Sequence, residues 1–175
     1  DRFSLIIAET LKQYLYVFKE RNILKTKNEF GNFSFINEVF QRCYLKDENI
    51  KIYFNNLINS ENDADYSRYT FFYLNYLLKK NEYEEAKNIT NNIEYLNSSL
   101  LVSQGKKWIE SQKIEEFKKI FSCSNPTDII SEFFYLVSNI YSSDDNYEKS
   151  NFYLNISHYL NPKFKFNLSL LAENY

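Results

Sequence analysis

The segment SEFFYLVSNIYSSDDNYEKSNFYLNISHYLNPKF, residues 131–164, decides the fold of this chain. Large apolar side chains recur in it at steps of three and four residues, which is the spacing of one face of an α-helix. The polar run SSDDN interrupts this pattern for only a few residues, as a turn between antiparallel helices does. Asn161 and Pro162 end the second half, because the residue before a proline is disfavoured in the helical conformation. The segment therefore predicts two helices, over residues 127–142 and 146–159.

The same pattern recurs upstream with a period near 34 residues. The segments NEYEEAKNI, QKIEEFKKI and DNYEKSNFY align on Tyr83, Ile114 and Tyr147, which are 31 and 33 residues apart. In the helix before the turn, the small residues Gly105 and Ser138 each stand nine residues ahead of the aligned position. A repeat of this length with helical periodicity predicts an array of helix pairs.

Residues 131–164 resemble the tetratricopeptide repeat (TPR), a pair of antiparallel helices. Large apolar residues occupy the positions where the family has them, at Phe134, Val137, Tyr141 and Leu154. The family's small residues correspond to Ser138, Ser150 and Ser157. Its aromatic residue corresponds to Tyr147, and its closing proline to Pro162. The resemblance implies an all-α fold, a right-handed superhelical solenoid of antiparallel helix pairs.

The other copies of the repeat depart from the family pattern. In the copies at about 67–97 and 98–130, Leu74 and Phe117 stand where small residues are usual. Small residues let the two helices of a pair cross closely, and we expect each serine hydroxyl there to bond a carbonyl one turn back in its own helix. Residues 165–175 resemble the first helix of a partial further repeat, with Leu171, Ala172 and Tyr175 in register.

Composition and periodicity predict helices along the whole chain. The 175 residues include two glycines and two prolines, too few for the many tight turns of a sheet fold. The expected helices are 2–21, 33–45, 48–59, 65–80, 82–96, 99–111, 113–123, 127–142, 146–159 and 165–175. We expect residues 1–64 to form a helical N-terminal segment of degenerate repeats, and residues 65–175 to form the TPR-like repeats. Asn125 and Pro126 are expected to end one helix, and Thr127 to cap the next.

The charge and hydropathy of the chain argue against binding to nucleic acid and against insertion into a membrane. The net charge of −2 disfavours non-specific binding to nucleic acid, which needs clustered Lys and Arg. No stretch approaches the roughly 18 apolar residues of a membrane span, so no membrane insertion is expected. Cys43 and Cys123 fit no metal or redox spacing. Two buried thiols are the favoured interpretation of these cysteines, and a disulfide remains open, as does the compartment.

Residues that suggest chemistry each have a simpler structural interpretation. His158 is the only histidine, so neither a His-pair zinc site nor a conventional triad with a spare base is expected. Acidic pairs at Glu84–Glu85 and Glu115–Glu116 fall in the first turn of a helix, where negative charge interacts favourably with the positive end of the helix dipole. Gly105 precedes two lysines, but no glycine-rich loop surrounds it, and a helix-packing role is favoured.

The run DADYSRYTFFYL, residues 63–74, resembles a calcium-binding loop only at its start. Arg68 stands where such a loop has glycine and Leu74 where it has glutamate, so we expect no calcium site. Asp65 is better interpreted as a helix N-cap. We therefore predict no catalytic, cofactor-binding or metal-ligating residue, and no enzyme activity for this chain.

The TPR resemblance implies a second stripe of residues on the first helix of each repeat. In that family the stripe lines a concave groove that holds extended peptides or partner helices. Aromatic side chains there would anchor a partner, and Asn amides can both donate to and accept from a peptide backbone. The candidate partner-binding residues are Arg68, Phe71, Asn75, Lys79, Lys106, Tyr135 and Asn139. The alternative is that these residues are solvated or buried against a neighbouring segment.

These observations predict a non-catalytic protein–protein interaction scaffold that binds a peptide or helix of a partner protein. The family's carboxylate clamp for chaperone tails needs a lysine where Phe71, Val102 and Tyr135 stand, so chaperone-tail binding is not expected. Two alternatives remain, a helical accessory domain of a larger enzyme and self-association through stacked terminal repeats. The sequence does not indicate which protein is the partner.

Overall fold

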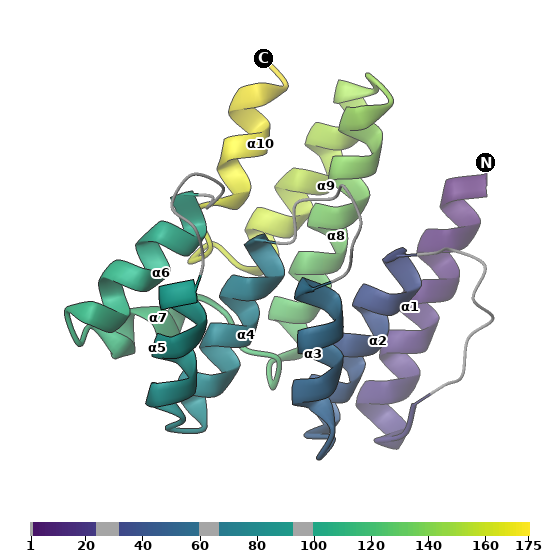
Figure 1. Ribbon diagram of the computed structural model, residues 1–175. Helices are drawn as coiled ribbons and strands as arrows, with labels where there is room; N and C mark the ends of the chain where they lie inside the picture. Colours follow the sequence, from purple (N-terminus) through teal and green to yellow (C-terminus); the bar gives the residue numbers. More distant parts are fainter. Residues whose placement is uncertain (1, 24–31, 60–66, 93–99) are drawn as a thin grey trace. The chain divides into compact units, whose positions relative to one another are not determined.

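The computed structural model of the chain describes residues 2–23, 32–59, 67–92 and 100–175, and in these residues it is all-helical (Figure 1). The helices are α1 (Arg2–Glu20), α2 (Asn32–Leu45), α3 (Ile50–Ile58), α4 (Ser67–Lys79), α5 (Tyr83–Asn92), α6 (Leu100–Glu110), α7 (Ile114–Ile120), α8 (Pro126–Ser143), α9 (Tyr147–Leu160) and α10 (Asn167–Glu173). Each of the ten expected segments overlaps one of these helices, which confirms the all-α prediction. The expected cap Asp65 lies outside the described residues.

The helices divide into two compact units that are not continuous in sequence. Unit 1 comprises Asp1–Asp47 and Cys123–Tyr175, and therefore holds α1, α2, α8, α9 and α10. Unit 2 comprises Glu48–Ser122 and holds α3 to α7, so it is inserted between two parts of unit 1. The division between residues 64 and 65 that the sequence suggests lies outside the described residues and stays a prediction.

The first helices of the predicted repeats end in the same hydrogen-bonded turn. Asn81, Gln112 and Asp145, just beyond α4, α6 and α8, all have positive φ, as does Lys46 beyond α2. In each turn this residue donates its N–H to the carbonyl three residues back, and the next N–H donates to the carbonyl five residues back, at 2.8–3.2 Å. These two bonds define the Schellman motif, which satisfies the last carbonyls of a helix. The turns after α4, α6 and α8 follow one another at 31 and 33 residues, the spacing found in the sequence.

Two of these turns contain the same kind of side-chain hydrogen bond. The Tyr83 hydroxyl donates to Oδ1 of Asn81 at 2.9 Å, and the Tyr147 hydroxyl donates to Oδ1 of Asp145 at 2.8 Å. The tyrosine at the aligned position therefore holds the turn residue two places before it. This contact gives a physical role to an aromatic residue that the sequence pattern identifies only by its spacing.

The N-cap of α8 lies two residues before the predicted one, and the helix begins one residue earlier than expected. Asn125 is the N-cap, and its Oδ1 accepts from the backbone N–H of Thr127 at 3.2 Å and from the Thr127 hydroxyl at 2.7 Å. Pro126 begins the helix, a position where a missing N–H costs nothing because that N–H has no intrahelical partner. The prediction that Thr127 caps this helix is therefore wrong, and Pro126 starts a helix where we expected it to end one.

Helices α8 and α9 form an antiparallel pair held by small side chains (Figure 1). The Ser138 hydroxyl donates to the carbonyl of Ser150 at 2.7 Å, and the Ser131 hydroxyl donates to the carbonyl of Ser157 at 2.8 Å. All four serines are buried. We expected the hydroxyls of Ser138, Ser150 and Ser157 to bond carbonyls in their own helix. That of Ser138 instead bonds across the pair, as that of Ser131 does, because the close crossing brings the carbonyls of α9 within reach.

Helix α10 attaches to this pair through two amides on one of its faces. Nδ2 of Asn167 donates to the hydroxyl of Ser157, and Nδ2 of Asn174 donates to the hydroxyl of Ser150, both at 2.9 Å. The two asparagines are seven residues apart, as are the two serines, so both bonds form along one line of contact. Leu170, which lies between the two asparagines in sequence, is also buried. A polar seam therefore runs from α8 through α9 to α10.

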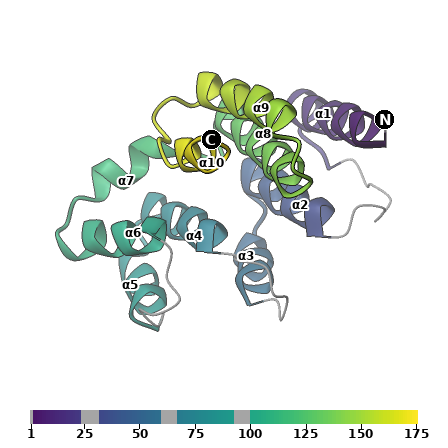
Figure 2. The same cartoon turned by 90° about the horizontal axis from the view of Figure 1, so that it is seen from above.

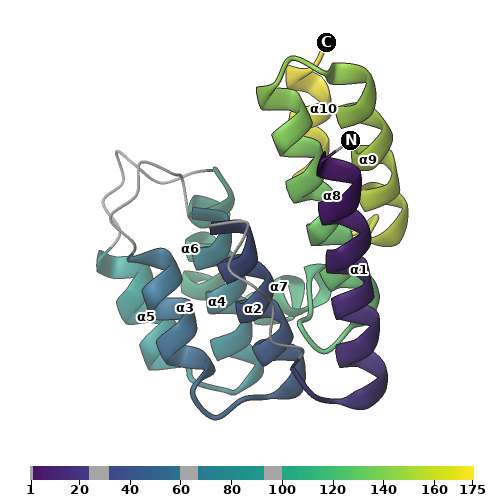
Figure 3. The same cartoon turned by 90° about the vertical axis from the view of Figure 1, so that its right-hand side faces the viewer.

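The remaining helices of unit 1 pack on α8. Seen from above, α8 lies between α9 and α2 (Figure 2), and α1 runs alongside it (Figure 3). Tyr14 of α1 is buried against Phe133 of α8, and its hydroxyl donates to Oδ1 of Asn37 on α2 at 2.6 Å. Burial, reinforced by the charge of Glu132, holds the pKa of Tyr14 well above its usual value. The three helices thus pack around aromatic side chains, and the buried Tyr14 hydroxyl has a hydrogen-bond partner.

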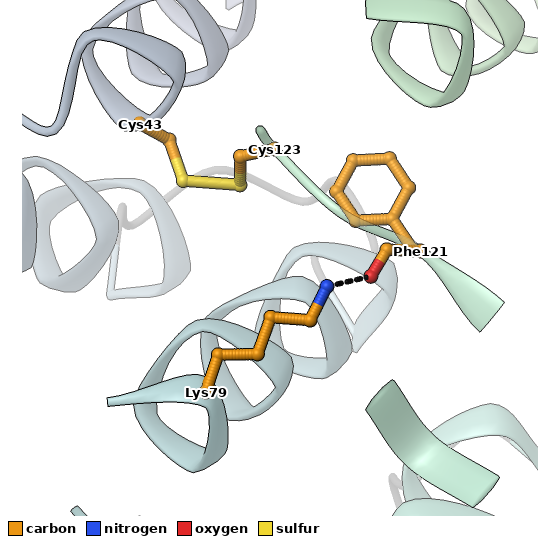
Figure 4. Close-up of a disulfide and its surroundings, with 4 residues drawn as sticks. All are labelled: Cys43, Lys79, Phe121 and Cys123. Carbon is orange, nitrogen blue, oxygen red and sulfur yellow. Dashed lines mark hydrogen bonds between the residues drawn. A yellow bond between two sulfur atoms is a disulfide. The ribbon is translucent and has the colours of Figure 1, made fainter. Parts of the chain in front are cut away.

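A disulfide closes unit 1 where the chain leaves it and returns. Cys43 near the end of α2 is bonded to Cys123, with their Cα atoms 5.6 Å apart (Figure 4). Both cysteines are buried. The expectation of two buried thiols is therefore wrong, and the alternative that the sequence left open holds. The whole of unit 2 lies within the loop that this bond closes.

Candidate interaction surface

In unit 2 the predicted anchor Phe71 is covered by another helix of the same unit. Its ring is fully buried and stacks on Phe117 of α7, with centroids 4.3 Å apart. Gly105 of α6 makes room for this pair, because a Cβ on it would lie 2.9 Å from Cε2 of Phe117. Phe117, which departs from the family pattern, therefore fills the space that the glycine leaves. Phe71 is a core residue here and offers no surface to a partner.

Asn75 and Lys79, one and two turns after Phe71 on α4, hold the end of α7. The Asn75 amide donates to the carbonyl of Phe117 at 2.8 Å, and Nζ of Lys79 donates to the carbonyl of Phe121 at 2.7 Å (Figure 4). The last carbonyls of a helix have no intrahelical partner, and a cation near them also interacts favourably with the negative end of the helix dipole. These two side chains therefore stabilise unit 2, as the alternative interpretation of the stripe allowed.

The two other candidates in unit 2 are half-buried cations. The guanidinium of Arg68 lies 5.6 Å from the ring centroid of Phe72, within the range of a cation–π contact. Lys106 lies on α6 and is half-buried. Phe71 and Asn75 are buried, so unit 2 does not present its five candidates as one accessible cluster.

In unit 1, Tyr135 and Asn139 remain at the surface of α8. They are one turn apart, with Tyr135 half-buried and Asn139 exposed, and Ser143 is exposed one turn further on. We call these three residues the α8 face. It presents a phenol, an amide and a hydroxyl in a row, with the Ser143 hydroxyl donating to the carbonyl of Ile140 at 2.8 Å. Such a row can both donate to and accept from an extended backbone.

The sequence interpretation missed the outer side of α9. Phe152 and Tyr159 are 61% and 83% exposed, while Ser150, Leu154 and Ser157 on the other side of the helix are buried. The signal was present, because residues 152 and 159 are seven apart and diverge by about 160° on the helix from Ser150 and Ser157. The repeat pattern predicts a supporting role for this helix and places the candidate residues on the helix before it.

A charged cluster in unit 2 links α3, α4 and α5. Nζ of Lys51 pairs with the carboxylate of Glu82 and lies 2.7 Å from Oε2 of Glu85, whose Oε1 accepts from the Tyr73 hydroxyl at 3.0 Å. The hydrogen bonds to Glu82 and Glu85 raise the pKa of Lys51, and the hydrogen bond from Lys51 lowers the pKa of Glu85. Burial, followed by the bond to Glu85, raises the pKa of Tyr73. Each of these groups is shifted away from neutral pH, so the cluster serves structure better than proton transfer.

Within residues 2–23, 32–59, 67–92 and 100–175, no group of three or more His, Cys, Asp or Glu side chains is arranged to hold a metal ion. No helix among the described residues has the length and apolarity needed to cross a bilayer.

Comparisons with known proteins add no identification. No protein-family model, no curated protein and no solved structure matches this chain. The case for a function therefore depends on the arrangement of this chain's own residues.

Proposed function

We propose that this chain is a non-catalytic, TPR-like helical-repeat module that binds a peptide or helix of a partner protein. The observation that carries the proposal is the recurrence of one Schellman turn after α4, α6 and α8, at Asn81, Gln112 and Asp145. A repeated structural unit with no shared chemical group is typical of proteins that present an extended binding surface. TPR-like geometry is therefore the architecture we infer for these helix pairs.

The crossing residues of the three helix pairs support the same proposal. At the aligned crossing positions stand Leu74 with Ala86, Gly105 with Phe117, and Ser138 with Ser150, and all of them are buried. Each pair combines either one large side chain with a small one or two small ones, so the space at the crossing is conserved although the residues are not. The two departures from the family pattern, Leu74 and Phe117, are each matched by a smaller partner. Degenerate copies of one repeat account for this compensation.

The α8 face is the site we propose for the partner. Tyr135, Asn139 and Ser143 lie along two turns of one helix and are not buried in the seams of unit 1. Tyrosine combines a large contact area with a hydroxyl and is enriched among residues that dominate binding energy. Asn139 beside it can hold a backbone amide of an extended segment.

Peptide display tests this function without knowledge of the partner. Peptides are selected from a random display library on the full chain, and their dissociation constants are measured by titration calorimetry. We expect Tyr135→Ala combined with Asn139→Ala to weaken binding at least about tenfold, which corresponds to about 1.4 kcal/mol. Helical circular dichroism should stay near that of the unsubstituted chain, because neither residue lies in a buried seam.

A matched control is available in unit 2. Asn88 is exposed on α5, and Asn88→Ala should leave the dissociation constant within about twofold, since it lies outside the proposed site. Asn139→Asp, which removes the amide donor but keeps the size, should weaken binding as well. Selected peptides that bind the double variant as tightly as the unsubstituted chain would refute the α8 face as the site.

A further inference from the structure

Several segments of the chain carry the acceptor motif for N-linked sugars. The motif is an asparagine followed two places later by serine or threonine, with any residue except proline between them. Its copies begin at Asn32, Asn88, Asn97, Asn155 and Asn167. The side chains of Asn32 and Asn97 lie outside the described ones, so the structure allows a comparison of the other three.

The folded chain treats these three asparagines differently. Asn88 on α5 and Asn155 on α9 are exposed, whereas Asn167 on α10 is fully buried. Nδ2 of Asn155 donates to the carbonyl of Asn151 at 2.9 Å, and a glycosylated amide keeps one N–H for that bond. Nδ2 of Asn167 instead donates to the hydroxyl of Ser157 at 2.9 Å inside unit 1. The fold therefore accommodates a sugar at Asn88 and Asn155 and leaves no room for one at Asn167.

The hydroxyl residues of the two accessible motifs show when a sugar is added. Thr90 and Ser157 are both buried, and the Thr90 hydroxyl donates to the carbonyl of Lys87 at 2.9 Å. A transferase that reads the hydroxyl together with the asparagine cannot reach both in these helices. The transfer therefore precedes folding. A sugar placed on Asn167 at that stage would keep α10 from docking, so correctly folded chains carry none there.

The disulfide gives independent support, because it concerns the compartment in which the chain folds. Structural disulfides form and persist in oxidising compartments such as the lumen of the endoplasmic reticulum, and they are rare in the cytosol. Cys43 and Cys123 are the only cysteines of the chain, and they are bonded to each other and buried. N-linked sugars are typical of proteins that pass through the same secretory compartments.

We propose that Asn88 and Asn155 carry N-linked oligosaccharides, added as the chain enters an oxidising secretory compartment. In the transfer, Nδ2 of the asparagine forms a bond to the anomeric carbon of a lipid-pyrophosphate-linked oligosaccharide. The bond from that carbon to the pyrophosphate oxygen breaks, and the lipid pyrophosphate leaves with the bonding electrons. One amide proton passes to a base of the transferase. Neither acceptor belongs to the α8 face, so the inference does not depend on the proposed function.

Peptide mass spectrometry of the full chain, recovered by antibody from the cells that produce it, tests the proposal. Peptide N-glycosidase in heavy-oxygen water converts each glycosylated asparagine to a labelled aspartate. We expect the label at Asn88 and Asn155, and none at Asn167. Asn139 is the internal control, since it is exposed but lacks the motif. Absence of label at both expected positions overturns the proposal, and label at only one overturns it for the other. Label at Asn167 in the folded chain overturns the role given to its burial.

Variants produced through the secretory pathway of cultured animal cells test the two sites separately. Asn88→Gln and Asn155→Gln should each reduce the mass of the chain by one oligosaccharide, and together by two. Both positions are exposed, so helical circular dichroism should stay near that of the unsubstituted chain. Asn139→Gln, the matched control, should leave the attached sugar unchanged. An attached mass that neither Asn88→Gln nor Asn155→Gln reduces would refute the assignment of these two sites.

Discussion

Gly105 is the residue on which the packing of unit 2 most visibly depends. Alanine in a helix is favoured over glycine by about 1 kcal/mol. At this position, however, the new Cβ would lie 2.9 Å from the Phe117 ring, which stacks on Phe71 and meets Trp108 edge-on. Overpacking of a core costs about 1–3 kcal/mol, so we expect Gly105→Ala to lower the free energy of unfolding by about 1 kcal/mol in urea titrations.

The second half of this test separates overpacking from other effects of the substitution. Gly105→Ala combined with Phe117→Leu should show a positive coupling, because the smaller side chain relieves the contact. Lys107→Ala, at an exposed position of the same helix, should change the free energy of unfolding by less than about 0.5 kcal/mol. A chain made more stable by Gly105→Ala would show that the Phe117 ring can move aside.

Glu85 predicts a pH dependence of stability in unit 2. The hydrogen bond from Lys51 lowers the pKa of Glu85 below its ordinary value of 4.5, so the folded state favours the carboxylate. The stability that this bond contributes is present above pH 4.5 and is lost as the pH falls through the lowered pKa. Urea titrations should therefore find Glu85→Gln less stable than the unsubstituted chain at pH 7, with the difference shrinking at acid pH.

Glu84 provides the control for this titration. It precedes Glu85 in the same first turn of α5 and is exposed, so Glu84→Gln should leave the pH profile of stability unchanged. A difference between Glu85→Gln and the unsubstituted chain that stays constant from pH 7 to acid pH would count against the ion pair as the cause.

Prediction from sequence succeeded for residues whose role depends on local spacing. Gly105 was expected to pack against a neighbouring helix, and it does so. Phe71 and Asn75 were placed on an accessible stripe because spacing alone does not reveal what lies above a helix face. The residue that covers them, Phe117, is 42 positions further along than Asn75, and it looked like a defect in the repeat.

At the scale of single elements, α10 is attached by side-chain hydrogen bonds as well as by the buried Leu170. Asn167 and Asn174 bond the hydroxyls of Ser157 and Ser150, and α10 itself has only seven residues. A helix this short is not stable without such contacts. We expect Asn167→Ala combined with Asn174→Ala to raise the hydrogen-exchange rates of α10 strongly, and those of α8 much less.

The outcome that contradicts this account of α10 is equally visible in hydrogen exchange. Unchanged protection of Asn167–Glu173 in the double variant would mean that Leu170 and its neighbours hold the helix without the amides. Ser169→Ala is a suitable control, because Ser169 is exposed and bonds only a carbonyl of the preceding turn in this structure.

The helices themselves were predictable because apolar periodicity persists over every segment. Their ends were less so. Asn125 and Pro126 carry both a stop and a start signal, and only the geometry shows that Asn125 caps α8. Left-handed turn residues at Lys46 and Gln112 have no sequence signal, since neither glycine nor asparagine stands there.

At the scale of the whole chain, the disulfide constrains the unfolded state most. Cys43 and Cys123 are 80 residues apart, and a loop of this length is expected to contribute about 4 kcal/mol through the reduced entropy of the unfolded chain. The variant Cys43→Ser with Cys123→Ser should therefore unfold at clearly lower urea concentration than the oxidised chain. An identical midpoint for the two would mean that the bond does not contribute to stability. The reduced unsubstituted chain should behave like the double variant.

The division into two units could not be predicted from the sequence. Two cysteines indicate neither that they pair nor that the intervening residues form a separate unit, because the choice between thiols and a disulfide depends on distance in the fold. The repeat period was visible, yet it runs from unit 2 into unit 1 and gives no sign of a boundary at Ser122. The two units are distinguished by contacts between residues that are far apart in the sequence.

The proposed binding of a partner segment along the α8 face is the central claim. Chemical-shift mapping of the isotopically labelled chain with a display-selected peptide tests it most directly. We predict that the largest shifts fall on Tyr135, Asn139 and Ser143, with small shifts along α9 and through unit 2. Largest shifts on α9 or in unit 2, with α8 unaffected, would contradict the proposed site.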